Sequence, residues 1–169
     1  MDDTPHEYLR CSKTQWEALC YATHGDKNAS RLEQVVRMCL PATQTEWYAS
    51  VQNLKSRLLD NLEKKMIALV SVTTEKDLID LYFIQHHLRR VVLVLLLPDT
   101  ERHTIAMSHR LHPYFMCSAD TEVSELMDVL KTILAHGTPP QSIEQFRNPF
   151  EALMPHRSSE FNDHWIQAA

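Results

Sequence analysis

Glycine is scarce in this sequence, which has only Gly25 and Gly137 among its 169 residues. A Walker A loop and a dinucleotide-binding turn each need several glycines, because the backbone must turn tightly and approach a phosphate closely. The sequence therefore contains neither motif. This excludes nucleotide hydrolysis on a P-loop and nicotinamide chemistry on a standard Rossmann turn, and we expect no cofactor.

Cysteine pairs of the CxxC type, which mark many metal and redox sites, are also missing. Two of the cysteines fall in predicted helices and one in a predicted strand, which favours reduced thiols over a disulfide framework. The N-terminal sequence MDDTPHEYLR is acidic and polar, unlike a secretory signal peptide. We therefore expect a cytoplasmic protein. The cysteines are Cys11, Cys20, Cys39 and Cys117.

Basic residues are not in excess: 17 Lys and Arg face 22 Asp and Glu, for a net charge of −5. Nucleic-acid binding usually requires a basic surface, and anionic lipids attract polybasic runs. A helix-turn-helix within residues 14–41 is disfavoured, because its second helix has few basic side chains. The longest apolar run, residues 91–97, is far shorter than the roughly 20 residues of a membrane-spanning helix. We expect neither nucleic acid nor a membrane as partner.

Apolar, strand-like runs alternate with amphipathic helices between residues 65 and 137. The runs cover 66–72, 91–97 and 114–117. Helices are predicted over 74–89, over 100–111, and from Thr121 to Gly137, and Thr74 with Asp77 matches a capping box. This alternation is typical of parallel βαβ units. The fold class predicted is α/β, with a parallel sheet of three or more strands, flanking helices, and a preceding helical N-terminal segment.

The N-terminal segment, residues 1–64, is predicted to contain helices over 14–24, 28–41 and 43–64. Asn28 or Ser30 is the expected cap of the second helix, and Gly25 the expected end of the first. The third helix has an apolar stripe, which either packs on its own domain or forms a dimerisation surface. The stripe consists of Trp47, Val51, Leu54, Leu58 and Leu62.

Residues 138–169 lose the alternating pattern, because four prolines interrupt them. They are predicted to form an irregular C-terminal arm. The arm has several aromatic side chains, which we expect to pack along its own domain or against a partner subunit.

The stretches VVLVLLLPDT and PYFMCSADTE together resemble the receiver domain of two-component response regulators. In receivers a hydrophobic strand ends in an acidic phosphoacceptor, followed by a short apolar step and Pro-Asp. A later strand ends in Ser or Thr followed by Ala. Residues 95–99 (LLLPD) resemble the first pattern, and Ser118-Ala119 the second. The resemblance covers residues 65–137 and implies a flavodoxin-like domain that acts in signal transduction, with a signalling protein as a possible partner.

The resemblance also has departures that bear on phosphotransfer. The position corresponding to the phosphoacceptor is Val94, which cannot accept a phosphoryl group. No acidic pair follows an earlier strand, so the Mg²⁺ site of receivers is not built. No strand ending in Lys-Pro follows residue 137, and helices within 14–64 take the place of the receiver's first strand. The resemblance therefore implies a degenerate receiver, a pseudo-receiver that keeps the scaffold and lacks phosphotransfer.

Hydroxyl and carboxyl side chains follow the ends of the three predicted strands, which parallel pairing brings to one edge of the sheet. There they could bind a small polar ligand or a cation. The favoured alternative is that they cap the helices that follow, because each stands where an N-cap is expected. The candidate ligand-binding residues are Thr73, Thr74, Asp99, Thr100, Ser118 and Asp120.

Histidine and cysteine offer weaker candidates. His109 and His112 are spaced to share a helix face, but no further Cys or His completes a metal site, so none is predicted. Surface histidines at a helix C-terminus are the favoured interpretation. Cys117 is expected to be a core residue, because a reactive thiolate needs an accessible, electropositive setting.

Two functions are compatible with these patterns. The preferred one is a non-enzymatic regulatory or protein-interaction module, built on a degenerate receiver-like domain and acting as a homodimer. The alternative is a small ligand-binding protein or enzyme that uses the C-terminal ends of the parallel strands.

Overall fold

Five parallel strands form the single sheet of the computed structural model, which describes residues 16–23, 25–60 and 65–136. The strand order across the sheet is β2-β1-β3-β4-β5, and every pair is parallel. The predicted α/β class is confirmed. The strands are β1 (Trp16–Tyr21), β2 (Thr45–Tyr48), β3 (Lys65–Ser71), β4 (Val92–Leu97) and β5 (Phe115–Ser118).

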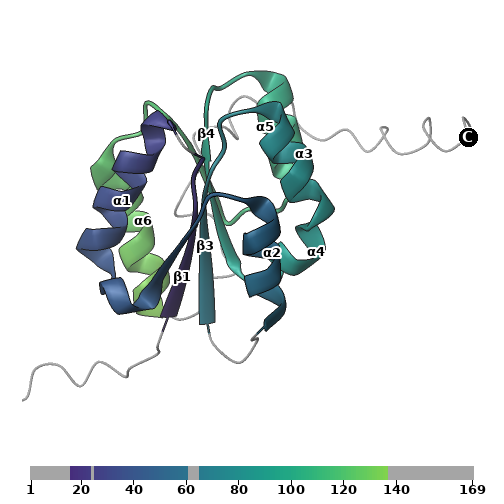
Figure 1. Ribbon diagram of the computed structural model, residues 1–169. Coiled ribbons are helices and arrows are strands. Elements are labelled where there is room, and N and C mark those ends of the chain that lie inside the picture. The colour runs from purple at the N-terminus through teal and green to yellow at the C-terminus, as the bar shows by residue number, and fades with distance from the viewer. Residues whose placement is uncertain (1–15, 24, 61–64, 137–169) are drawn as a thin grey trace, which may run out of the picture.

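Helices cover both faces of the sheet (Figure 1). Two of them, α1 and α6, pack on one face, and α2 to α5 pack on the other. The helices are α1 (Lys27–Cys39), α2 (Val51–Asp60), α3 (Glu75–Phe83), α4 (Gln85–Leu88), α5 (Arg102–His109) and α6 (Val123–His136), with a short 3-10 turn η1 (Ala42–Gln44).

The strand order 2-1-3-4-5 is that of doubly wound, flavodoxin-like sheets. It arises because α1 leads the chain from β1 outward to β2, and α2 then returns it across β1 to β3. The fold is therefore compatible with a receiver-like domain.

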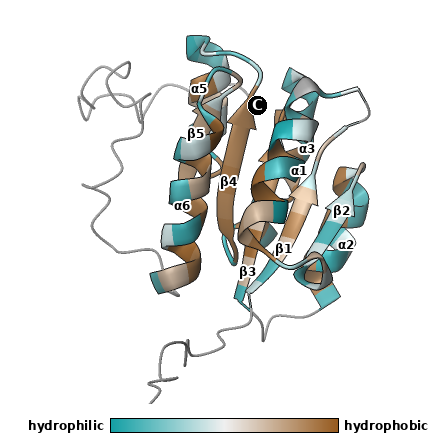
Figure 2. Ribbon diagram, turned by 90° about the vertical axis from the view of Figure 1, so that its left-hand side faces the viewer, coloured by the Kyte–Doolittle hydropathy of each residue, from teal (hydrophilic) through white to brown (hydrophobic). Residues whose placement is uncertain are grey.

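Alternate side chains of the central strands enter two separate cores. Ala68 and Val70 of β3 face the core under α2 to α5, while Ile67 and Leu69 face the core under α1 and α6. Because both faces are covered, β3 and β4 are apolar almost throughout (Figure 2), as is typical of buried parallel strands. The outer faces of the helices are hydrophilic in the same view.

The prediction of a helix over 14–24 is wrong, because residues 16–21 form β1. Trp16, Leu19 and Cys20 have helical spacing, but every residue of β1 except Glu17 is buried. A strand buried on both faces shows no alternation, so its pattern resembles that of a buried helix. Gly25 does not end a helix; it lies at φ +84° in the turn before α1, a conformation that suits glycine.

The predicted helix over 43–64 is also corrected. Residues 45–48 form the edge strand β2, and α2 begins only at Val51. The backbone N–H of Gln52 donates to the hydroxyl of Ser50 at 3.2 Å, at the start of α2. The helix over 28–41 is confirmed as α1, but its cap is Asp26, which accepts from the Asn28 N–H at 2.8 Å.

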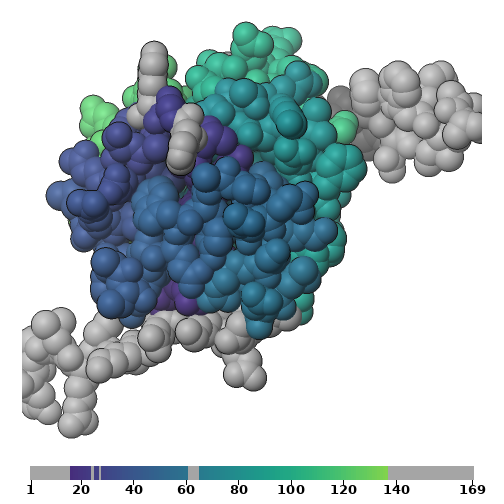
Figure 3. All heavy atoms as spheres, in the orientation of Figure 1, coloured from purple at the N-terminus to yellow at the C-terminus, as the bar shows by residue number. Residues whose placement is uncertain are grey.

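These corrections replace the predicted helical N-terminal segment, over its described residues 16–60, by two strands and two helices. β1 lies between β2 and β3, so residues 16–60 belong to the same sheet and cores as residues 65–136. In the space-filling view, the purple and blue segments form one continuous surface with the teal segments (Figure 3). Residues 1–15, Leu62 and the predicted arm over 138–169 lie outside the described residues.

The other predicted helices are present. Thr74 and Asp77 form the predicted capping box of α3, and a break at Ile84 separates α3 from α4. No helix in the described part of the chain is long and apolar enough to cross a membrane.

Candidate functional site

The crevice between the C-terminal ends of β1 and β3 is the candidate site. In doubly wound sheets the two strands at the switch point send their connections to opposite faces, which leaves a crevice where ligands bind. Here β1 leads to α1 on one face, and β3 leads to α3 on the other. The residues at this crevice are Tyr21, Thr23, Thr73, Thr74 and Asp77.

Asp77 is the centre of a hydrogen-bond network that spans the crevice. Its Oδ2 accepts from the backbone N–H of Thr73 at 3.0 Å and of Thr74 at 2.9 Å. The hydroxyls of the same two threonines reach Oδ2 at 2.8 and 3.1 Å. The Tyr21 hydroxyl donates to Oδ1 at 3.2 Å, and the Thr23 and Thr73 hydroxyls lie 3.2 Å apart. We call these five residues the Asp77 network.

The network fixes the ionisation of its members. Burial alone would raise the pKa of Asp77, but the hydrogen bonds from Thr73 and Thr74 outweigh it and hold the pKa below its ordinary value. Burial, and then the Asp77 charge, raise the pKa of Tyr21. A carboxylate and a neutral phenol are therefore the stable pair, and their polar atoms are used by the protein itself.

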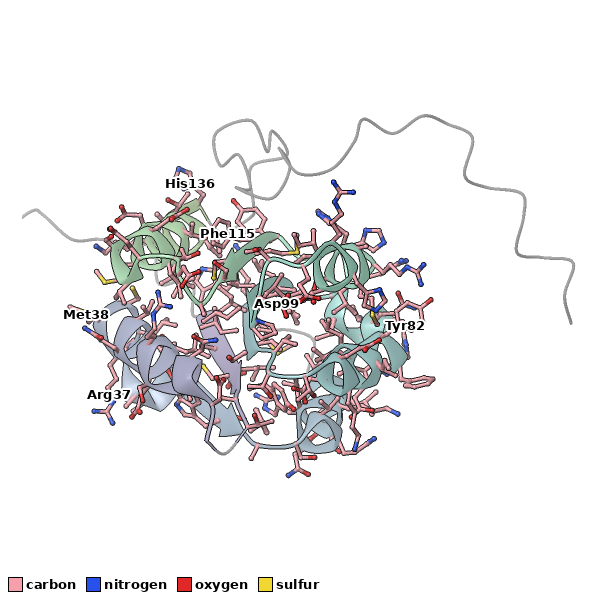
Figure 4. All side chains as sticks on the ribbon, turned by 90° about the horizontal axis from the view of Figure 1, so that it is seen from above. Arg37, Met38, Tyr82, Asp99, Phe115 and His136 are labelled. Carbon is pink, nitrogen blue, oxygen red and sulfur yellow. The ribbon has the colours of Figure 1, made fainter. Side chains whose placement is uncertain are left out.

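The six predicted ligand-binding residues all follow strand ends, but the structure divides them. Thr73 and Thr74 belong to the Asp77 network. Asp99, near the middle of the molecule in Figure 4, accepts from the Glu101 N–H at 3.0 Å, in a turn that leads into α5. Thr100 and Asp120 are exposed.

Ser118, the last residue of β5, is almost fully buried, and its N–H donates to the Thr121 hydroxyl at 3.1 Å. The Arg31 guanidinium donates to the carbonyl of Ala119 and covers this strand end. Within the described residues, no hydrogen bond or ion pair joins Asp99, Ser118 or Asp120 to the Asp77 network.

Val94 does not lie at a strand end. It is fully buried in the middle of β4, paired with Leu69 and Phe115. The predicted correspondence with a phosphoacceptor is therefore wrong by one βα unit, because the missing first strand is present as β1. By position, the third strand is β3, whose end carries Ser71, Val72 and Thr73.

The predicted dimerisation stripe is also corrected. Val51, Leu54 and Leu58 are buried against the sheet, with Leu54 at 0% exposure, so they contribute to the core of their own domain. Trp47 lies on β2 and is 44% exposed.

Two smaller features complete the candidates. Cys117 is buried as expected, its thiol 3.6 Å from the Leu95 carbonyl oxygen, and burial raises its pKa to about 12. In the described residues no group of three or more His, Cys, Asp and Glu side chains could hold a metal ion.

Sequence patterns missed the part that Asp77 and Tyr21 play. Asp77 looks like an ordinary capping residue, since Thr74 stands three positions before it. The helix predicted over 14–24 includes Tyr21, so this prediction does not place its hydroxyl beside a strand end. Recognising β1 as a strand would have put Tyr21 and Thr23 next to Thr73, because parallel neighbours end at the same edge.

Comparison with known proteins shows a likeness of fold and no family. No protein-family model and no curated protein matches the sequence. The structure is similar to the crystal structure of a Burkholderia pseudomallei protein that is named as pilus assembly-related, with a TM-score of 0.54 and 13% sequence identity. The match covers 70% of this chain and 90% of that one. At this identity the likeness is one of fold.

Proposed function

We propose that this chain is a non-enzymatic regulatory module that acts through protein contacts on a receiver-like scaffold. The observation that supports this most is the Asp77 network. The crevice where doubly wound folds place their ligands is spanned by hydrogen bonds between the chain's own side chains. A ligand there would have to replace these bonds and leave buried polar groups to find new partners, which is costly.

The residues at the strand ends support the same proposal. Receivers need an acidic phosphoacceptor at the end of one strand and an acidic pair after another. Here β1 is followed by Ala22 and Thr23, and β3 ends in Ser71 and is followed by Val72. The carboxylates that follow the ends of β4 and β5 are Asp99, which accepts a backbone hydrogen bond, and Asp120, which is exposed.

Protein contact is supported by an apolar helix face. Ile79, Tyr82 and Phe83 lie on one side of α3 and are 41%, 43% and 73% exposed. Clustered exposed apolar side chains often mark interaction sites. We call these three residues the α3 face, and we propose that it pairs with a second copy of the chain, as an isologous contact in a homodimer. The name of the Burkholderia protein, which refers to pilus assembly, is compatible with a role in protein association.

The phosphotransfer part of the proposal is tested by incubating the chain with acetyl phosphate and Mg²⁺ and measuring its intact mass. A functional receiver serves as the positive control. We expect the mass of this chain to stay unchanged while the control gains a phosphoryl group. A phosphorylated form that is stoichiometric and sensitive to hydroxylamine would contradict the proposal, because it would require an aspartyl phosphate.

A ligand-binding function at the strand ends is the second candidate. It is favoured by a hollow of about 540 Å³ beside the ends of β1 and β2, near Thr23, Glu33, Trp47 and Tyr48. A thermal-shift panel of metals, nucleotides and sugar phosphates separates the two. A stabilising ligand whose effect is lost in Trp47→Ala favours this second function, while a response that this substitution leaves unchanged counts against it.

A further inference from the structure

A second hollow lies at the opposite edge of the sheet from the Asp77 network. Helices run antiparallel to the strands in this fold, so the ends of α3, α4 and α5 meet at the edge where the strands begin. The hollow there has a volume of about 400 Å³, within the usual range of ligand pockets. It is lined by Tyr82, Gln85, Arg89, His109, Arg110 and His112. None of these six residues is acidic.

Among the described residues, the two arginines of this hollow have no carboxylate partner. Arg37 and Arg57 form ion pairs with glutamates elsewhere in the structure. In the described part of the chain, no carboxylate lies within ion-pair distance of Arg89 or Arg110. Tyr82 is 43% exposed and lies at the periphery of the molecule in Figure 4.

Positive charge extends beyond the lining residues. Burial lowers the pKa of His87, and the nearby His86, Lys55 and Arg90 lower it further. The smaller contributions from these three side chains place further positive groups near α4.

Helix dipoles do not cancel this charge. The C-terminal ends of α3, α4 and α5 each present at most about −0.5 of an elementary charge, so together they offset at most about 1.5 positive charges at this edge. Arg89 and Arg110 supply two. The sum of the arginine charges and the helix-end charges is positive even when every histidine is neutral. Helix dipoles therefore offset only part of the positive charge of this hollow.

His112 is held in an unusual backbone conformation. Its φ of +53° makes it the only described residue other than glycine with a positive φ. Glycine suits this position after a helix better than histidine does. Strained residues of this kind are often found at functional sites. The imidazole of His112 is thus placed at the hollow by a conformation that costs stability.

We propose that this hollow binds the phosphoryl group of a small phosphorylated ligand, with Arg89 and Arg110 donating to its oxygens. Planar guanidinium groups match phosphate geometry and form strong charge-assisted hydrogen bonds. His112 adds a further donor, and Tyr82 bounds one side of the hollow. The proposal goes beyond the regulatory function: the site lies away from the Asp77 network, and it shares Tyr82 with the α3 face.

Calorimetric titration of the full chain with inorganic pyrophosphate tests this site. We expect saturable binding at one site, weakened at least tenfold by Arg89→Ala or by Arg110→Ala, since each removes a charged hydrogen-bond donor. Arg102→Ala is the matched control: Arg102 is an exposed arginine of α5 that does not line the hollow. It should change the affinity less than about twofold. No binding by the unaltered chain, or an equal loss in the Arg102 variant, would overturn the proposal.

His112→Gly separates a ligand role from a structural one. Relief of the positive φ should raise the melting temperature by about 2 to 4 °C. Loss of the imidazole should at the same time weaken pyrophosphate binding several-fold. A more stable variant with unchanged affinity would contradict the role given to His112.

Repeating the titration with AMP distinguishes two classes of ligand, a phosphate ester with an aromatic part and an inorganic or non-aromatic phosphate. Tighter binding of AMP than of pyrophosphate, with the difference lost in Tyr82→Leu, assigns the site to a phosphate ester with an aromatic part. Arginine-dependent binding of pyrophosphate alone supports an inorganic or non-aromatic ligand. Failure of both probes to bind overturns the site.

Discussion

Asp77 accepts four hydrogen bonds at one oxygen and a fifth at the other, so its charge is stabilised by the fold. A carboxylate whose pKa is lower in the folded than in the unfolded chain adds stability above its unfolded pKa. That stability is lost as the pH falls through the lower, folded value. At the residue scale, five of the hydrogen bonds at the strand-end crevice therefore depend on one ionised group, the Asp77 carboxylate.

Replacement of Asp77 by asparagine tests this role. An amide is neutral, so the four donors at Oδ2 lose the charge-assisted part of their hydrogen bonds, and the Tyr21 hydroxyl faces an NH2 group where it now donates to Oδ1. We expect Asp77→Asn to reduce the free energy of unfolding by about 2 to 3 kcal/mol in urea titrations at pH 7. Below about pH 4 the difference from the unaltered protein should shrink, because Asp77 is then protonated in the unfolded chain and becomes protonated in the folded chain only at lower pH.

Asp80→Asn, on the same helix, is the matched control for this change. We expect it to alter the free energy of unfolding by less than about 0.5 kcal/mol. A similar loss in both variants, or a loss in Asp77→Asn that persists unchanged at pH 3, would contradict the role of the network.

Thiol reactivity is a second residue-scale prediction. Burial raises the pKa of Cys20 and of Cys117 to about 12, whereas Cys39 is only partly buried. The thiolate is the reactive form, so Cys39 should be alkylated by iodoacetamide at pH 8 well before the other two. Peptide mass spectrometry at timed intervals measures this order. Rapid alkylation of Cys117 in the native protein would show that β5 is more open than described.

At the scale of elements, an ion-pair cluster joins α2 to the sheet edge. Arg57 of α2 lies 2.6 Å from the Glu17 carboxylate of β1 and 3.1 Å from that of Glu46 on β2. Arg57→Ala would leave Glu17, which is largely buried, without this partner. We expect a loss of about 2 kcal/mol in the free energy of unfolding, measured in urea.

Arg37→Ala provides the comparison, because the Arg37–Glu33 pair on α1 is exposed. Exposed pairs contribute little, so the loss there should be below about 0.5 kcal/mol. Equal effects of the two substitutions would mean that the cluster does not hold α2 in place.

Sequence patterns predicted the elements whose apolar residues recur with a clear period or whose ends have a clear capping or stop residue. α1, α3, α5, α6, β3, β4 and β5 were predicted within a few residues, and the capping box at Thr74 was predicted outright. β1 and β2 were missed for different physical reasons. β1 is buried on both faces and contains Ala and Leu, which favour helices, while β2 is short and leads directly into the apolar stripe of α2.

The candidate site was predicted only in part because β1 was not recognised as a strand. Thr73 and Thr74 follow a strand that was recognised, whereas Tyr21 and Thr23 follow one that was not. The basic hollow could not be predicted, because Tyr82, Arg89 and Arg110 come from three elements whose ends meet only in the folded chain.

At the scale of the whole molecule, the α3 face is the proposed dimer contact. Light scattering during gel filtration measures the mass of the particle in solution. We expect a dimer that becomes a monomer in Phe83→Asp, since a carboxylate would be buried at the contact.

Met38→Asp is the matched control for the dimer, because Met38 is 62% exposed on α1 and lies on the opposite side of the molecule from Tyr82 (Figure 4). It should remain a dimer. A monomeric unaltered protein at micromolar concentration would refute the homodimer, and it would leave the closure of the crevice unaffected.

Amide chemical shifts in a ¹H–¹⁵N correlation spectrum test whether the hydrogen bonds of the Asp77 network keep ligands out of the strand-end crevice. The protein is titrated with Mg²⁺ and beryllofluoride, which together occupy a functional receiver site. The resonances of Thr23, Thr73, Thr74 and Asp77 should not move, because the groups that would bind are already hydrogen-bonded to one another. Saturable shifts at these four residues would contradict the account and show that the crevice opens to a ligand.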